Sequence, residues 1–205
     1  MPAPHTPDPA YGGLLLASAS PRRREILTRA GYTFAVHSPG VDELDDAHGD
    51  PVALVTENAR RKAAAAATAY PRACVLAADS TVALGNRILN KPNDRREAIA
   101  MLLSLNGRTH CVHTAVATVP PGGEPRLLFE TSEVAFYDLP QDEIAAYVDA
   151  ARPFDKAGSY GIQDPGNPLV RDYSGLLSNI IGLPVERLTA PLAALGIHPD
   201  RVART

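Results

Sequence analysis

Short apolar runs, most of them bounded by Gly, Pro or Asn, divide this chain into predicted strands. The predicted strands cover residues 12–20, 32–40, 73–84, 87–90, 109–119 and 126–139. A Gly-Asn pair at 85–86 predicts a tight turn, and the segment PPGGEP at 120–125 predicts an antiparallel pairing of the last two strands.

Apolar stripes at helical spacing alternate with these strands and predict five helices. The predicted helices cover residues 20–31, 51–70, 93–107, 141–151 and 184–196. The clearest of them has Asp94 and Glu97 at capping-box spacing and Gly107 as its stop. Helices and strands alternate early and strands pair in mid-chain, so we predict an α/β protein with a mixed β-sheet and flanking helices.

The composition and the net charge exclude several classes of protein. Residues 1–12 include four prolines and no basic-then-apolar pattern, which predicts a loose tail followed by one domain over 13–205. A net charge of −3 argues against nucleic-acid binding, and no apolar run is long enough for a membrane span. The two cysteines have neither metal-site nor disulfide-framework spacing, so we expect a cytoplasmic protein.

Three consecutive arginines, Arg22 to Arg24, stand in the first turn of the first predicted helix, where acidic residues are usual. A helix N-terminus is a prepared anion site, and guanidinium groups suit phosphate oxygens. With the hydroxyls of Ser18 and Ser20, Arg22 and Arg23 therefore form a candidate phosphate site. The alternative is a solvated arginine face, to which we assign Arg24.

Lysine is rare in this chain, since only Lys62, Lys91 and Lys156 occur among 20 basic residues. A lysine kept against such a bias suits a site that needs a compact ammonium group, although chance is the alternative.

Asp79 ends an apolar run, where a carboxylate is costly unless a cation or metal holds it. The alternative is an Asp that caps a turn. The acidic segment around Glu43 could join Asp79 in binding Mg²⁺, which takes few carboxylates plus substrate phosphates. Neither a P-loop nor a GxGxxG turn occurs.

Taken in order, eight segments resemble the Maf family of nucleoside triphosphate pyrophosphatases. They are LASASPRRREIL, VDE, ENARRKA, LAADSTV, ILNKP, AIAMLLSLNGRTHCVHTAVA, DKAGSYGIQ and NIIGLP. The resemblance implies two lobes around a deep cleft, similar to inosine triphosphate pyrophosphatases. It also implies hydrolysis of a nucleotide to its monophosphate and pyrophosphate, dependent on Mg²⁺ or Mn²⁺, by a homodimer. The charge and the lack of a membrane span lead us to expect neither nucleic acid nor membrane as a partner.

The resemblance also implies roles for single residues. Asp79 and Lys91 would be catalytic, and Glu43 and Asp79 would hold the metal. The substrate-binding residues would be Ser18, Ser20, Arg22, Arg23, Lys62, Ser80, Lys156 and Gln163. Arg22 together with Gln163 resembles the dTTP/UTP branch, whereas Ser80 departs from the Thr of that branch, and the segment DYSGLLSNIIGLP departs from the usual approach to the last motif.

Two other classes of function compete with this interpretation. A non-catalytic, nucleotide-binding regulator of cell division would keep the site and lack turnover, which the presence of Asp79 and Lys91 disfavours. A nucleic-acid-binding module using the arginine cluster is disfavoured by the net charge and the few aromatic residues.

Overall fold

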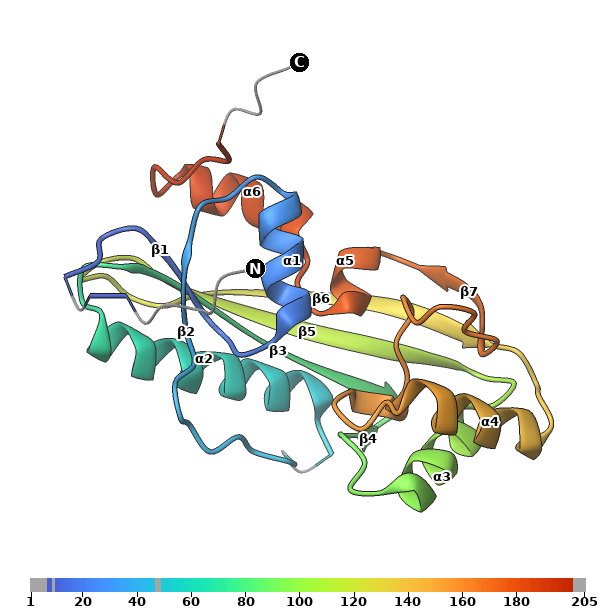
Figure 1. Ribbon diagram of the computed structural model, residues 1–205. Helices are drawn as coiled ribbons and strands as arrows, with labels where there is room; N and C mark the ends of the chain where they lie inside the picture. The colour runs from blue at the N-terminus through green and yellow to red at the C-terminus, as the bar shows by residue number, and fades with distance from the viewer. Residues whose placement is uncertain (1–6, 9, 47–48, 201–205) are drawn as a thin grey trace, which may run out of the picture.

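The computed structural model describes residues 7–8, 10–46 and 49–200 (Figure 1). The predicted tail at 1–12 lies largely outside these residues. The strands are β1 (Leu14–Ala17), β2 (Ala35–His37), β3 (Cys74–Leu84), β4 (Arg87–Leu89), β5 (Thr109–Val119), β6 (Arg126–Phe136) and β7 (Val170–Ser174). The helices are α1 (Pro21–Arg29), α2 (Pro51–Ala69), α3 (Arg95–Leu105), α4 (Gln141–Ala151), the 3₁₀ turn η1 (Ala157–Ser159), α5 (Leu177–Ile181) and α6 (Val185–Ala193).

The seven strands form one mixed sheet, as predicted. Its order is β2-β1-β3-β5-β6-β7, and β4 pairs with β3 outside this path. The pairs of β1 with β2 and with β3 are parallel, whereas β3, β5, β6 and β7 pair in antiparallel fashion. The predicted antiparallel pairing of 109–119 with 126–139 is therefore confirmed.

The sheet is buried on both faces at one end, which explains the continuous apolar runs in its strands. Along β1, Leu15 and Ala17 face α2, whereas Leu14 and Leu16 face α1 and α6. In Figure 1, α2 lies below the sheet, with α1 and α6 above it. The alanines of α2 let this helix approach the sheet closely. We call this end of the molecule the first lobe.

A second hydrophobic cluster forms at the other end, and we call this end the second lobe. It packs α3 and α4 against the far ends of the long central strands, with Phe136 and Ile144 fully buried in it. Strands β3, β5 and β6, each of 11 residues, run through both lobes (Figure 1). The two-lobed α/β architecture expected from the sequence is confirmed.

The local differences from the prediction have simple causes. Asp94 caps α3 by accepting from the Glu97 backbone N–H at 2.8 Å, but the Glu97 carboxylate accepts from Asn93 and not from Asp94. Strand β7 and helix α5 were not predicted, because β7 is mostly exposed and α5 has only five residues and no side-chain cap. In the described part of the chain, no helix has the length and apolar character needed to cross a membrane.

Candidate active site

A cleft of about 710 Å³ lies between the two lobes, and every predicted site residue lines it. These residues are Ser18, Ser20, Arg22, Arg23, Glu43, Lys62, Asp79, Ser80, Lys91, Lys156 and Gln163. They lie up to 145 positions apart in the sequence (18 to 163), and the fold brings them together around one cleft.

The deepest charges of the cleft belong to Lys62 on α2 and Asp79 on β3. Lys62 Nζ lies 2.7 Å from Asp79 Oδ1 and 2.8 Å from Glu43 Oε1. Both Lys62 and Asp79 are 8% exposed, whereas the Glu43 side chain is 46% exposed. One buried ammonium group therefore pairs with a buried and a half-buried carboxylate. These ion pairs offset the free-energy cost of removing the charged groups from water.

The pKa of Glu43 reflects this arrangement. Desolvation raises it, but the hydrogen bond and charge of Lys62, with the charges of Lys91 and Arg23, outweigh that effect. The pKa therefore lies below its ordinary value, and Glu43 is an anion at neutral pH.

Asn58 is a site residue that the sequence analysis missed. Its amide donates to Asp79 Oδ2 at 3.2 Å and to the Leu44 carbonyl at 2.9 Å, and its side-chain oxygen accepts from the Leu44 N–H. Asn58 thus fixes the orientation of Asp79 and ties the segment carrying Glu43 to α2. The spacing of Asn58 and Lys62, four residues apart on one helix, places both on one face and was a usable signal.

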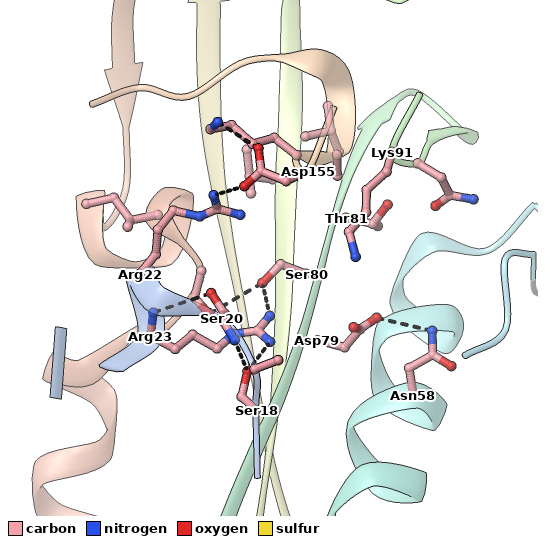
Figure 2. Close-up of a pocket in the computed structure, with 18 of the residues that line it drawn as sticks. Ser18, Ser20, Arg22, Arg23, Asn58, Asp79, Ser80, Thr81, Lys91 and Asp155 are labelled. Carbon is pink, nitrogen blue, oxygen red and sulfur yellow. Dashed lines mark hydrogen bonds and ion pairs between the residues drawn. The ribbon is translucent and has the colours of Figure 1, made fainter. Parts of the chain in front are cut away.

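The arginines at the start of α1 differ in what they contact (Figure 2). Arg23 donates to the Gly182 carbonyl at 2.9 Å, Ser80 Oγ at 3.1 Å and Ser18 Oγ at 3.2 Å. Desolvation lowers its pKa, against the charges of Asp79 and Glu43, which raise it. Three of its five N–H groups donate to protein oxygens, so Arg23 ties α1 to β3 and to the backbone just after β1 and α5. Within the part of the chain that the structure describes, the other two N–H groups have no acceptor and are available to a ligand.

The N-terminus of α1 has the predicted geometry. Ser20 is the N-cap, its hydroxyl accepting from the Arg23 backbone N–H at 3.5 Å, and Pro21 takes the first position. Arg22 reaches across the cleft to Asp155 in the second lobe, 2.7 Å away. Sequence reasoning missed Asp155, although it stands next to Lys156 in the DKAGSYGIQ segment.

The second lobe contributes the remaining polar groups. Among the described residues, Lys91 has no ion-pair partner, and Figure 2 shows its side chain pointing into the cleft. Gln163 lies on the segment after η1, which Asp164 fixes by accepting from the Tyr147 hydroxyl at 2.6 Å and from the Gly161 N–H at 3.1 Å. The lobe thus offers to the cleft the ammonium group of Lys91, unpaired within the described residues, and the amide of Gln163 on an anchored segment.

Ser80, the departure from the expected Thr, keeps the hydroxyl in use. Its Oγ accepts from Arg23 and lies 2.9 Å from the Thr114 hydroxyl on β5. The hydrogen-bonding function therefore needs only the oxygen.

Glu43 and Asp79 suit a divalent metal that is held by two carboxylates. No group of three or more His, Cys, Asp or Glu suited to a metal occurs within the described residues. Mg²⁺, however, is commonly held by one or two carboxylates plus substrate phosphates. Glu43 and Asp79 already share one cation, the Lys62 ammonium, so their oxygens converge as a two-carboxylate site requires.

This chain is similar in sequence to known proteins over most of its length. The sequence model of Maf-like proteins matches residues 13–195. A dTTP/UTP pyrophosphatase of Myxococcus xanthus is 44% identical over 184 residues, which cover 90% of this chain and 93% of that protein. A dTTP/UTP pyrophosphatase of Symbiobacterium thermophilum is also 44% identical, over 183 residues, which cover 89% of this chain and 94% of that protein.

A more distant likeness exists among solved structures. A nucleoside-triphosphatase / dITP/XTP pyrophosphatase of Mycobacterium abscessus is 20% identical, with a TM-score of 0.45. The match covers 89% of this chain and 98% of that chain.

Proposed function

This chain belongs to the Maf-like protein family, and on that premise we propose that it hydrolyses dTTP and UTP to the nucleoside monophosphate and pyrophosphate. The observation that carries the proposal is the charge arrangement of the cleft. Asp79 and Glu43 stand on one wall around Lys62, and Arg22, Lys91 and Lys156 line the same cleft.

The phosphates are proposed to bind at the start of α1 and at the lysines of the second lobe. The helix N-terminus presents backbone N–H groups and the positive end of the helix dipole. Arg22 offers a forked set of donors, and Lys91 and Lys156 offer compact charges. Lys91, which has no ion-pair partner among the described residues, is the cation proposed to neutralise the departing pyrophosphate.

The attacking water is proposed to bind to Asp79. Asn58 and Lys62 hold the two carboxylate oxygens of Asp79, which fixes the direction in which it can accept a proton. Water attack on the α-phosphorus forms a new P–O bond and breaks the bond to the bridging oxygen, so pyrophosphate leaves. Asp79 orients the water and takes its proton.

Glu43 and Asp79 are proposed to hold the Mg²⁺ or Mn²⁺ expected from the resemblance. When bound, the metal would supply charge stabilisation at the phosphate oxygens. Lys62 would then keep the two carboxylates in place beside it.

The base is proposed to contact Gln163. Thymine and uracil share an imide edge with one donor between two acceptors, and a primary amide carries both a donor and an acceptor. The anchoring of this segment by Asp164 and Tyr147 supports a fixed reading position.

Two further proposals concern assembly and location, the first resting on the resemblance and the second on the cysteines. We propose a homodimer, and we place the protein in the cytoplasm. Cys74 and Cys111 are free thiols in the structure, as suits a reducing compartment.

The function is tested with a panel of nucleoside triphosphates and Mg²⁺ or Mn²⁺, scored for pyrophosphate release. We expect dTTP and UTP to give the highest kcat/KM. A preference for 7-methyl-GTP or ITP would contradict the substrate assignment. Binding of nucleotide without turnover would favour the non-catalytic regulator.

Replacing Lys91 by Arg conserves charge but should lower the turnover of dTTP, because the longer, planar guanidinium cannot occupy the position of the ammonium. We expect a loss of about tenfold or more, which corresponds to about 1.4 kcal/mol. Thermal stability should stay unchanged, since Lys91 forms no ion pair among the described residues. Steady-state kinetics and a melting curve measure both.

Lys62→Arg should rank second in activity loss, and Lys156→Arg third. All three lysines line the cleft, so the control is an exposed arginine of β4, changed as Arg87→Lys. Wild-type turnover in Lys91→Arg would contradict the proposed role.

A further inference from the structure

Asp155 holds two cations of the proposed phosphate site at once. Its Oδ2 lies 2.7 Å from Arg22 Nη1, and its Oδ1 lies 2.8 Å from Lys156 Nζ. Both carboxylate oxygens are therefore engaged, each by a different cation. Figure 2 shows the two contacts meeting at Asp155 on the wall of the cleft.

The contact with Arg22 joins the two lobes. Arg22 stands in the first turn of α1, and Asp155 follows α4 in the second lobe, 133 positions later. Asp155 thus lies where an anion can contact the α1 N-terminus and the DKAGSYGIQ segment together. The Asp155 side chain is 60% exposed, so an anion entering from solvent can compete for the same cations.

A carboxylate and a phosphate group compete for the same donors. Both present oxygens that accept charge-assisted hydrogen bonds from guanidinium and ammonium groups, and a triphosphate carries more charge and more oxygens than one Asp. Asp155 would also repel a triphosphate that binds nearby.

We propose that Asp155 is an internal counter-ion, which occupies Arg22 and Lys156 in the empty cleft and gives them up to the polyphosphate of the substrate. This inference rests on the proposed function, because it assumes that Arg22 and Lys156 contact phosphate. Asp155 then sets the affinity of the cleft: it keeps the two cations in place between turnovers, and it weakens the binding of any anion that cannot replace it.

The ionisation of Asp155 is compatible with this role. Desolvation raises its pKa, but hydrogen bonds from Lys156 and Arg22 outweigh that effect, so the pKa lies below its ordinary value. The competing negative charge is therefore present throughout the neutral range.

The test compares binding of inorganic tripolyphosphate to the wild type and to Asp155→Asn by calorimetry. We expect the variant to bind about 1.5- to 5-fold more tightly, the range of one exposed ion pair. The KM for dTTP should fall in the same direction. Asp149→Asn is the matched control. Asp149 lies on α4, outside the cleft lining, and its exposed carboxylate forms a bidentate ion pair with Arg95. Its replacement should change neither the affinity for tripolyphosphate nor the KM for dTTP.

A second comparison separates competition from simple removal of a negative charge. In an Arg22→Gln background, Asp155→Asn should give a smaller gain, because one of the two cations it releases is missing. An equal gain in both backgrounds would overturn the proposal, as would unchanged or weaker binding in Asp155→Asn alone.

The result is distinguishable from the outcome of the proposed function. Tighter tripolyphosphate binding by Asp155→Asn supports the counter-ion whether or not the wild type releases pyrophosphate from dTTP. Turnover of dTTP with no gain in binding would overturn the counter-ion and leave the proposed function in place.

Discussion

Replacing Asp79 by Asn is expected to lower the turnover of dTTP by about 10²- to 10⁴-fold, the usual effect of losing an acid–base group. The amide keeps the shape of the side chain and its place beside Lys62 and Asn58, but it cannot take a proton from the attacking water. Measurement of kcat by pyrophosphate release tests this. Turnover within a few-fold of the wild type would contradict the role of Asp79.

The fold should tolerate this substitution. Removing one partner of a buried ion pair is costly when the other charge is left alone, but Lys62 keeps Glu43 at 2.8 Å. We expect the free energy of unfolding to change by no more than about 1 kcal/mol. The structure places Asp79 inside β3 and not at a turn, so the turn-capping alternative is wrong. An unfolded variant would instead mean that the charge of Asp79 is needed for folding, as the partner of Lys62 and Asn58. Asp149→Asn serves again as the control for an Asp-to-Asn change outside the cleft.

The metal dependence of Asp79→Asn separates the two roles that Asp79 can have. Loss of a metal ligand should raise the Mg²⁺ concentration needed for half-maximal residual activity. Loss of the proton acceptor alone should leave that concentration unchanged while kcat falls. A titration of both proteins with Mg²⁺ therefore assigns the role.

Replacing Lys62 by Met is expected to have the second large effect, this time on both activity and stability. The variant leaves Asp79, 8% exposed, next to Glu43 with no cation between them. Removing one partner of a buried ion pair typically costs about 3–5 kcal/mol of stability. We expect a loss approaching that range, reduced because Glu43 is half-exposed, together with loss of measurable turnover. Denaturant unfolding and kinetics measure the two.

The control for Lys62→Met is Arg60→Met on the same helix. Arg60 is exposed and pairs with Glu57 on the surface, so its replacement should change neither stability nor activity appreciably. Equal behaviour of the two variants would contradict the importance of the buried ammonium group.

The acid side of the stability profile gives a further readout of the same variant. Because the pKa of Glu43 lies below its ordinary value of 4.5, its charged form stabilises the wild type at neutral pH. This contribution is lost as the pH falls through the folded-state pKa. Without Lys62 the pKa of Glu43 should rise, so the stability of the variant should depend less on pH in this acidic range.

The central fold could be predicted from the sequence because its signals are local. The strands of the first lobe are buried on both faces, so they read as apolar runs, and Ser20, Asp94 and Pro21 mark helix starts directly. The segment at 170–181 carries no such signal. Strand β7 pairs along only a few residues of β6 with its side chains mostly exposed, so tertiary pairing and not apolar periodicity defines it.

The candidate site was predictable as a set of residues but not as a network. The type of charge and the order of the motifs single out Asp79, Lys62 and Arg22 as candidate site residues. The contacts that these residues make form only in the folded protein. The contact between Arg22 and Asp155 spans 133 positions, and that of Arg23 with the Gly182 carbonyl spans 159. Neither pairing leaves a periodic or spacing signal in the sequence, which is why the structural role of Arg23 was missed.

The most direct measurement is hydrolysis of dTTP in water enriched in ¹⁸O, followed by mass spectrometry of the products. Attack of water on the α-phosphorus at Asp79 places one labelled oxygen in dTMP and none in pyrophosphate. We predict that result for the wild type. Label in pyrophosphate with unlabelled dTMP would mean attack on the β-phosphorus and would contradict the proposed role of Asp79 at the α-phosphorus. Release of orthophosphate would mean a different reaction and would contradict the proposed function.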